Sequence, residues 1–162
     1  MKLRVIQIVV LMSFAFLGAR SASAQLMGSA FQPSDGASFI DSNGINVYNR
    51  DSMDHNVRAT FGLRHNQSQD GSHRWSFTWT VRVTNNGLEQ RCWIYAFNID
   101  TLQAPIVGTN ATTSSGSTSY NISLSGPDGF YAYSVLCKIP RDNGSMSYLY
   151  DVSSIDGWQF NY

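Results

Sequence analysis

The sequence has little charge, few helix-forming residues and almost no cysteine. Only 14% of its 162 residues are charged, and the basic and acidic groups balance at 11 each. Beyond residue 24 there is one glutamate, Glu89, and one lysine, Lys138, although helices normally rely on both types. No ten-residue window carries apolar residues at helical spacing, which excludes a coiled coil. The 43% apolar content excludes a disordered chain.

The chain also lacks an apolar run long enough to span a bilayer. The longest, residues 5–17, has about 13 residues where a spanning helix needs about 20. Lys2 and Arg4 precede this run, and the small residues Ala22-Ser23-Ala24 follow it. This is the pattern of a secretory signal peptide over residues 1–24, with cleavage before Gln25. The mature protein is then secreted or periplasmic, and we do not expect it to insert into a membrane.

The charge that remains after cleavage bears on partners. Removing the leader with its three basic residues leaves 11 − 3 = 8 basic groups against 11 acidic groups, a net charge of −3. The remaining arginines are scattered singly. A nucleic acid is therefore not an expected partner.

The two cysteines, Cys92 and Cys137, predict a single disulfide. Export places them where thiols oxidise, and only one intramolecular pairing is possible. A reactive thiol or a metal ligand is the alternative interpretation. Because both cysteines lie in apolar, strand-like segments, we favour the structural bond.

Apolar and polar residues alternate with period two along most of the mature chain, which indicates β-strands. The clearest run is Trp75–Val83, and Asn85-Asn86-Gly87 separates it from a second run over residues 90–99, so we predict that these two segments form an antiparallel hairpin. In residues 57–63, Phe61 and Leu63 are assigned to the same apolar face. Residues 109–119, rich in Ser, Thr and Gly, are interpreted as a connection. Further strands or hairpins are predicted in the ranges 38–48, 120–124, 130–139, 146–152 and 158–162.

These eight or nine segments predict an all-β fold. An antiparallel sandwich of about 7–9 short strands, possibly with Greek-key connections and with one disulfide, is the natural way to close them. We divide the chain into a signal peptide over residues 1–24, an N-terminal segment over residues 25–36 and a single β-domain over residues 37–162. The alternative is a small eight-stranded outer-membrane barrel, which the alternating C-terminus resembles.

The segment from Tyr133 to Pro140, followed by Ser147-Tyr148, resembles a loose group of small exported bacterial β-domain proteins of unassigned function. Members of that group often carry two further cysteines, where this chain has Phe31 and Phe61. The resemblance implies an exported β-domain and no activity. If those two cysteines are normally bonded, the two phenylalanines should be spatial neighbours.

Catalytic and metal-binding motifs are not found. There is no Gly-x-Ser-x-Gly elbow, no His-Glu-x-x-His and no glycine-rich phosphate loop. A zinc site formed by His55, His65 and His73 is less favoured than three surface histidines, and the turn aspartates lack a full calcium-loop pattern. We therefore predict no catalytic residue, no metal and no cofactor. A small secreted hydrolase built from converging aspartates stays an alternative.

The surplus of aromatic residues carries the one functional prediction. Residues 90–99 place Cys92, Ile94 and Ala96 on one face of a strand and Trp93, Tyr95 and Phe97 on the other. The second face is either covered or forms a flat stacking platform. On the second interpretation Trp93, Tyr95 and Phe97 bind a partner, either a carbohydrate or a cell-surface protein. The favoured function is then a non-catalytic binding or structural role outside the cell or in a periplasm.

Overall fold

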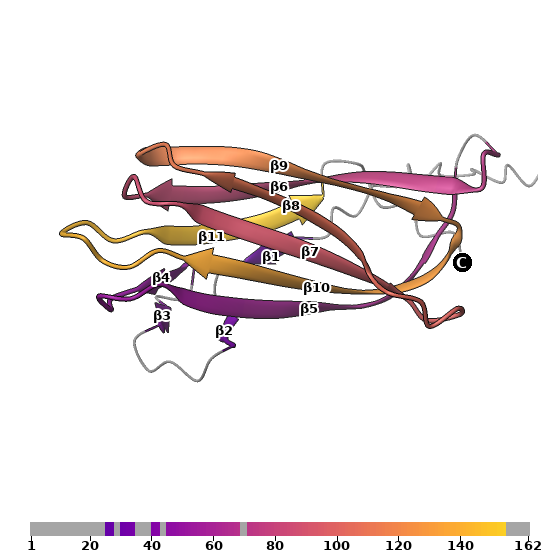
Figure 1. The fold of residues 1–162 in the computed structure, drawn as a ribbon, viewed down its shortest axis with the longest axis horizontal. Coiled ribbons are helices and arrows are strands. Elements are labelled where there is room, and N and C mark those ends of the chain that lie inside the picture. The colour runs from indigo at the N-terminus through magenta and orange to yellow at the C-terminus, as the bar shows by residue number, and fades with distance from the viewer. Residues whose placement is uncertain (1–24, 28–29, 35–39, 43–44, 69–70, 155–162) are drawn as a thin grey trace, which may run out of the picture.

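The computed structural model describes residues 25–27, 30–34, 40–42, 45–68 and 71–154, and it shows an all-β protein (Figure 1). Eleven strands form two antiparallel sheets, which confirms the predicted fold class. In the described residues no helix is long and apolar enough to cross a lipid bilayer. The predicted signal peptide and the predicted strand over residues 158–162 lie outside the described residues.

The first sheet has six strands in the order β3-β4-β11-β6-β9, and β1 also pairs with β11. Its strands are β1 (Gln25–Met27), β3 (Ile40–Ser42), β4 (Val47–Asn49), β6 (Arg74–Asn85), β9 (Gly116–Pro127) and β11 (Tyr148–Ser154). The pairing of β3 with β4 confirms the hairpin predicted within residues 38–48.

The second sheet has five strands in the order β2-β5-β10-β7-β8. Its strands are β2 (Gln32–Pro33), β5 (His55–Asn66), β7 (Gln90–Asn98), β8 (Ile106–Thr112) and β10 (Gly129–Ile139). Neither sheet closes on itself, since β3 and β9 end one strand order and β2 and β8 end the other, so the described strands form an open sandwich and not the single closed barrel of the alternative prediction. Residues 25–36 contribute β1 and β2 to the two sheets.

The core lies between the sheets and is built from the alternating apolar positions of both. Trp75, Trp79 and Val81 of β6 are buried, as are Ile94 of β7 and Val135 of β10. Phe31 belongs to this core and Phe61 packs against it. Their predicted contact with each other stays a prediction.

The disulfide joins Cys92 and Cys137 across neighbouring strands of the five-stranded sheet, as predicted. The two residues are direct partners in the β7–β10 ladder, with 4.1 Å between their Cα atoms, and both are fully buried. The hydroxyl of Tyr120, on β9 of the other sheet, lies 3.2 Å from Cys92 Sγ. The disulfide thus crosslinks β7 and β10 on the inner face of the five-stranded sheet, where Tyr120 of the other sheet packs against it.

The predicted hairpin between residues 75–83 and 90–99 is wrong. Strand β6 pairs with β9 and β11, whereas β7 pairs with β10 and β8, so the two strands belong to different sheets. The predicted turn between the two strands does form. Gly87 has a φ of +91°, and the backbone N–H of Asn86 donates to Ser147 Oγ at 3.1 Å. Two strands that are each apolar on one face can be neighbours in one sheet, or they can lie in two sheets that pack with their apolar faces together. Strands β6 and β7 take the second arrangement.

The Ser/Thr/Gly-rich stretch of residues 109–119 is also not a simple connection. Residues 109–112 complete β8 and residues 116–119 begin β9. Serine and threonine side chains on the exposed face of a sheet can form hydrogen bonds with residues of the neighbouring strand, which stabilises a strand that is polar on that face. For example, the hydroxyls of Thr84 and Ser117 lie 3.1 Å apart across the β6–β9 ladder.

Candidate functional site

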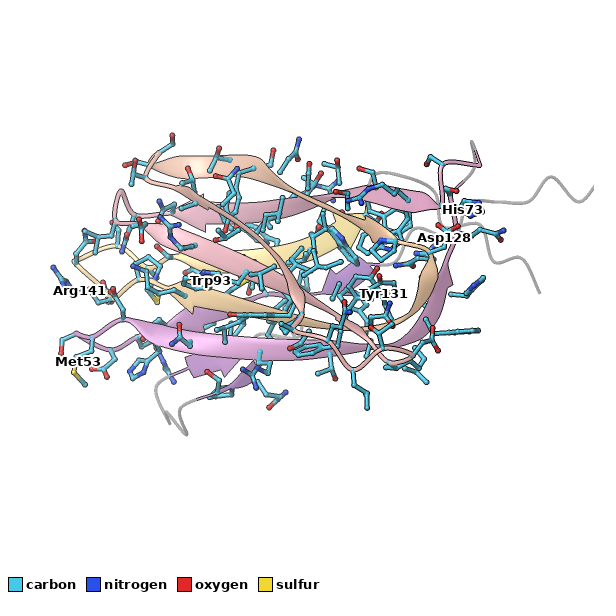
Figure 2. All side chains as sticks on the ribbon, turned by 45° about the vertical axis from the view of Figure 1, so that its right-hand side comes forward. Met53, His73, Trp93, Asp128, Tyr131 and Arg141 are labelled. Carbon is cyan, nitrogen blue, oxygen red and sulfur yellow. A yellow bond between two sulfur atoms is a disulfide. The ribbon has the colours of Figure 1, made fainter. Side chains whose placement is uncertain are left out.

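The outer face of the five-stranded sheet carries the three aromatic residues singled out in the sequence. Trp93, Tyr95 and Phe97 project from β7 on the side opposite the disulfide, and we call them the aromatic row. Trp93 and Tyr95 are partly exposed, and 41% of Phe97 is exposed. Figure 2 shows Trp93 on the five-stranded sheet, beside β10. The row is therefore most accessible at Phe97 and partly accessible at Trp93 and Tyr95.

The neighbouring strand leaves the aromatic row open from the side. On β10, Tyr95 faces Ser134 and Phe97 faces Ala132, so two of the three rings stand next to small side chains. The Tyr95 and Phe97 ring centroids are 6.3 Å apart, and their planes differ by 22°. The two rings are thus nearly parallel, at the spacing of successive residues on one face of a strand.

The aromatic row continues into an apolar surface at one end of the sheet. In the described part of the chain eight large apolar side chains are exposed, and six of them lie here. They are Leu63, Phe97, Ile99, Leu102, Val107 and Phe130. A concentration of this kind marks an interaction surface more often than single exposed residues do.

One of these residues, Leu63, was assigned to the wrong face from the sequence, and a β-bulge explains why. The β5–β10 register shifts at Ala132/Tyr133, so Tyr133 pairs with Phe61 whereas Ala132 pairs with Leu63. Gly62 is the extra residue, and beyond it the outward positions change parity. Phe61 therefore packs on the core, whereas 67% of Leu63 is exposed, which corrects their assignment to one face. A glycine inside a strand pattern is the local signal for such a bulge.

The opposite end of the aromatic row is charged. Arg91 Nη2 donates to Glu89 Oε2 at 2.9 Å, and Lys138 Nζ donates to Glu89 Oε1 at 3.1 Å. Lys138 also lies 3.6 Å from Asp54 Oδ2. Hydrogen bonds from Arg91, and then from Lys138, lower the pKa of Glu89 to about 2. Both cations next to Trp93 are thus held by acids of this chain.

This pKa shift predicts how acid affects the protein. Because the pKa of Glu89 is lower in the folded state than in the unfolded state, its contribution to stability is complete above the ordinary carboxylate value of 4.5 and is lost as the pH falls towards 2. Carbon-13 NMR of the side-chain carboxylates should show Glu89 titrating near the lower value. The variant Glu89→Gln should flatten the same part of the stability profile. Titration near 4.5 would contradict the ion pairs.

A hollow lies at the edge of the same sheet, where β2 meets β5. It has a volume of about 370 Å³, and Gln32, Pro33, Ser34, Arg58 and Thr60 line most of it. Arg58 and Thr60 are exposed, and they point outward from β5 on the side of the sheet that bears the aromatic row. The hollow therefore combines a guanidinium group with hydroxyl and amide groups.

A serine, a histidine and an aspartate that lie near one another, Ser68, His73 and Asp128, have a structural role. At the end of the sandwich labelled in Figure 2, Ser68 Oγ accepts a hydrogen bond from the backbone N–H of His73 at 3.0 Å, and Asp128 Oδ1 accepts one from the backbone N–H of Ser68 at 2.8 Å. The imidazole of His73 is 89% exposed and does not lie between hydroxyl and carboxylate. These groups hold two turns together and do not form a relay.

The three histidines are not brought together. His55 and His65 lie at opposite ends of β5, and His73 lies in the loop that follows it. His55 Nε2 is 2.7 Å from Asp51 Oδ2, and the ring of His65 packs on Phe130 with centroids 4.6 Å apart. Within the described residues there is no group of three or more metal-binding side chains.

The sequence matches no protein-family model and no curated protein. The structure is similar to a carbohydrate-binding module, CBM36, solved with calcium and xylotriose. The TM-score is 0.50 at 10% identity, over 81% of this chain and 98% of that one. At this identity the likeness shows the fold alone.

Two further carbohydrate-binding modules have lower scores. The module CBM6cm-2 from Cellvibrio mixtus lichenase 5A, solved with cellotriose, has a TM-score of 0.46 at 13% identity, over 81% of this chain and 95% of that one. The C-terminal CBM6 of the laminarinase LamC from Zobellia galactanivorans has a TM-score of 0.49 at 8% identity, over 82% of this chain and 98% of that one.

Proposed function

We propose that this protein is an exported, non-catalytic module that binds a carbohydrate chain on the outer face of its five-stranded sheet. The observation that carries the proposal is the aromatic row. Trp93, Tyr95 and Phe97 line one face of one strand, and each is at least partly exposed. Successive rings on one face of a strand are about 7 Å apart. Sugar rings have apolar faces that stack on exposed aromatic rings.

Polar groups beside the row would orient the sugar hydroxyls. Thr109 faces Trp93 from β8, and Ser134 faces Tyr95 from β10. Binding sites of this composition combine apolar area with a few placed donors and acceptors. The sandwich fold shared with a module solved with xylotriose supports the same class of ligand.

Removing the rings should abolish most of the binding. We expect Trp93→Ala and Tyr95→Ala each to weaken affinity for the bound glycan about tenfold or more, because aromatic anchors dominate such contacts. A glycan array identifies the glycan, and isothermal titration calorimetry measures the affinity. Tyr148→Ala is the matched control. Tyr148 lies on β11 of the six-stranded sheet, away from the proposed site, is partly exposed and packs on Tyr48 of the neighbouring strand β4. Equal loss in all three variants would contradict the site.

A cell-surface protein is the second candidate partner. The apolar end of the face favours it, because Leu102 is 85% exposed at a positive φ of 51° and offers a sugar no hydrogen-bonding group. Leu102→Ser should weaken a protein complex and leave a glycan complex unchanged. Binding of an isolated oligosaccharide by the wild-type protein decides in favour of the carbohydrate.

A further inference from the structure

The charges on the outer face of the five-stranded sheet are not balanced. The charged side chains that project outward from its strands, Arg58, Arg91 and Lys138, are all basic. Glu89 and Asp54 lie beside this face and pair with two of them. Arg58 has no ion pair with any residue that the structure describes. The face is thus positive at Arg58, whereas residues 25–162 together carry three more acidic than basic groups.

Arg58 lies within reach of a ligand on the aromatic row. In the strand registers Trp93 faces Leu136, and Leu136 faces Arg58, so two strand spacings, about 10 Å, separate Trp93 from Arg58. Two residues further along β7, Tyr95 faces Ser134 on β10, and Ser134 faces Thr60 on β5. A chain that stacks on Trp93 can therefore cross β10 and enter the hollow beside Arg58.

The hollow has the chemistry of an anion site. A guanidinium group offers a planar pair of N–H donors that matches the two oxygens of a carboxylate. Thr60 and Ser34 contribute hydroxyls and Gln32 an amide to the same hollow. The volume of about 370 Å³ is large enough for part of a sugar ring that bears such a group.

We infer that the glycan bound by this face is acidic, and that Arg58 binds the carboxylate of a uronic acid unit in the hollow between β2 and β5. This inference rests on the proposed function, and it adds the class of sugar and the residue that selects it. The paired cations Arg91 and Lys138 do not take this role, because Glu89 already holds both.

The test is a glycan array that contains uronic acid oligosaccharides and their methyl esters as matched pairs, followed by calorimetry. We expect the acid of each pair to bind more tightly than its neutral ester, and the preference to shrink as salt is added. Arg58→Gln should lower affinity for the acid about tenfold or more and leave affinity for the ester unchanged. Arg58→Lys should restore part of the preference, since it keeps the charge and loses the planar donor pair.

The matched control is Arg74→Gln, which removes the same charge from an exposed position on β6 of the other sheet. Equal binding of acids and esters, unaffected by Arg58→Gln, would overturn the inference and leave the proposed function intact. Equal losses in Arg58→Gln and Arg74→Gln would also overturn it, because the effect would then be one of net charge. Binding of no glycan at all would overturn both the inference and the proposed function.

Discussion

Replacing Cys92 and Cys137 together by alanine is expected to lower the free energy of unfolding by about 4 kcal/mol, the loop-entropy value for a crosslink that closes about 45 residues. The bond joins two fully buried partners of one ladder, so native geometry need not change when it is removed. Urea denaturation followed by far-UV circular dichroism measures the change.

The control for this prediction is the wild-type protein after reduction under denaturing conditions, which lacks the crosslink but keeps both side chains. Its stability should match that of the double variant within about 1 kcal/mol. A difference between wild type and variant below about 1 kcal/mol would show that the disulfide does not constrain the unfolded chain as proposed.

The variant Trp79→Ala should be destabilised by about 3–5 kcal/mol, the range for removing a large aromatic side chain from a packed core. Trp79 is fully buried, and its ring lies 4.9 Å from that of Phe61 and 6.0 Å from that of Tyr133. It packs between the inner faces of the two sheets, so its removal leaves a cavity in the core. Thermal unfolding should show a fall in Tm of roughly 10 °C.

Trp93→Ala is the matched control, because the same substitution is made on the opposite side of a strand. Trp93 lies on the outer face and is partly exposed, so its removal should cost less stability than Trp79→Ala and most of the glycan affinity. The two variants thus separate the role of a tryptophan in the core from its role at the surface. If both lost stability equally, Trp93 would be a packing residue and the platform would not exist.

Much of the candidate site was predictable from local pattern. Alternation placed Trp93, Tyr95 and Phe97 opposite Cys92, and the structure shows the two sets on opposite faces of β7. Whether the aromatic face was covered was not predictable, because a second layer comes from elements distant in sequence. Arg58 gave no signal either: it became noteworthy only when the β2–β5 and β5–β10 pairings placed it on the same face as Trp93.

The sequence by itself determined that the chain is built of β-strands, which side of β7 carries the aromatic residues and which two cysteines are bonded. Those properties depend on side-chain periodicity and on the number of cysteines, both of which are local or countable. Only the tertiary structure decided that β6 and β7 stack instead of pairing, that the bulge at Gly62 turns Leu63 outward, and that the β2–β5 hollow opens beside the aromatic face. Each of these features depends on which strands are neighbours. Many pairings between strands distant in sequence are equally compatible with the local alternation, so the sequence pattern does not distinguish them.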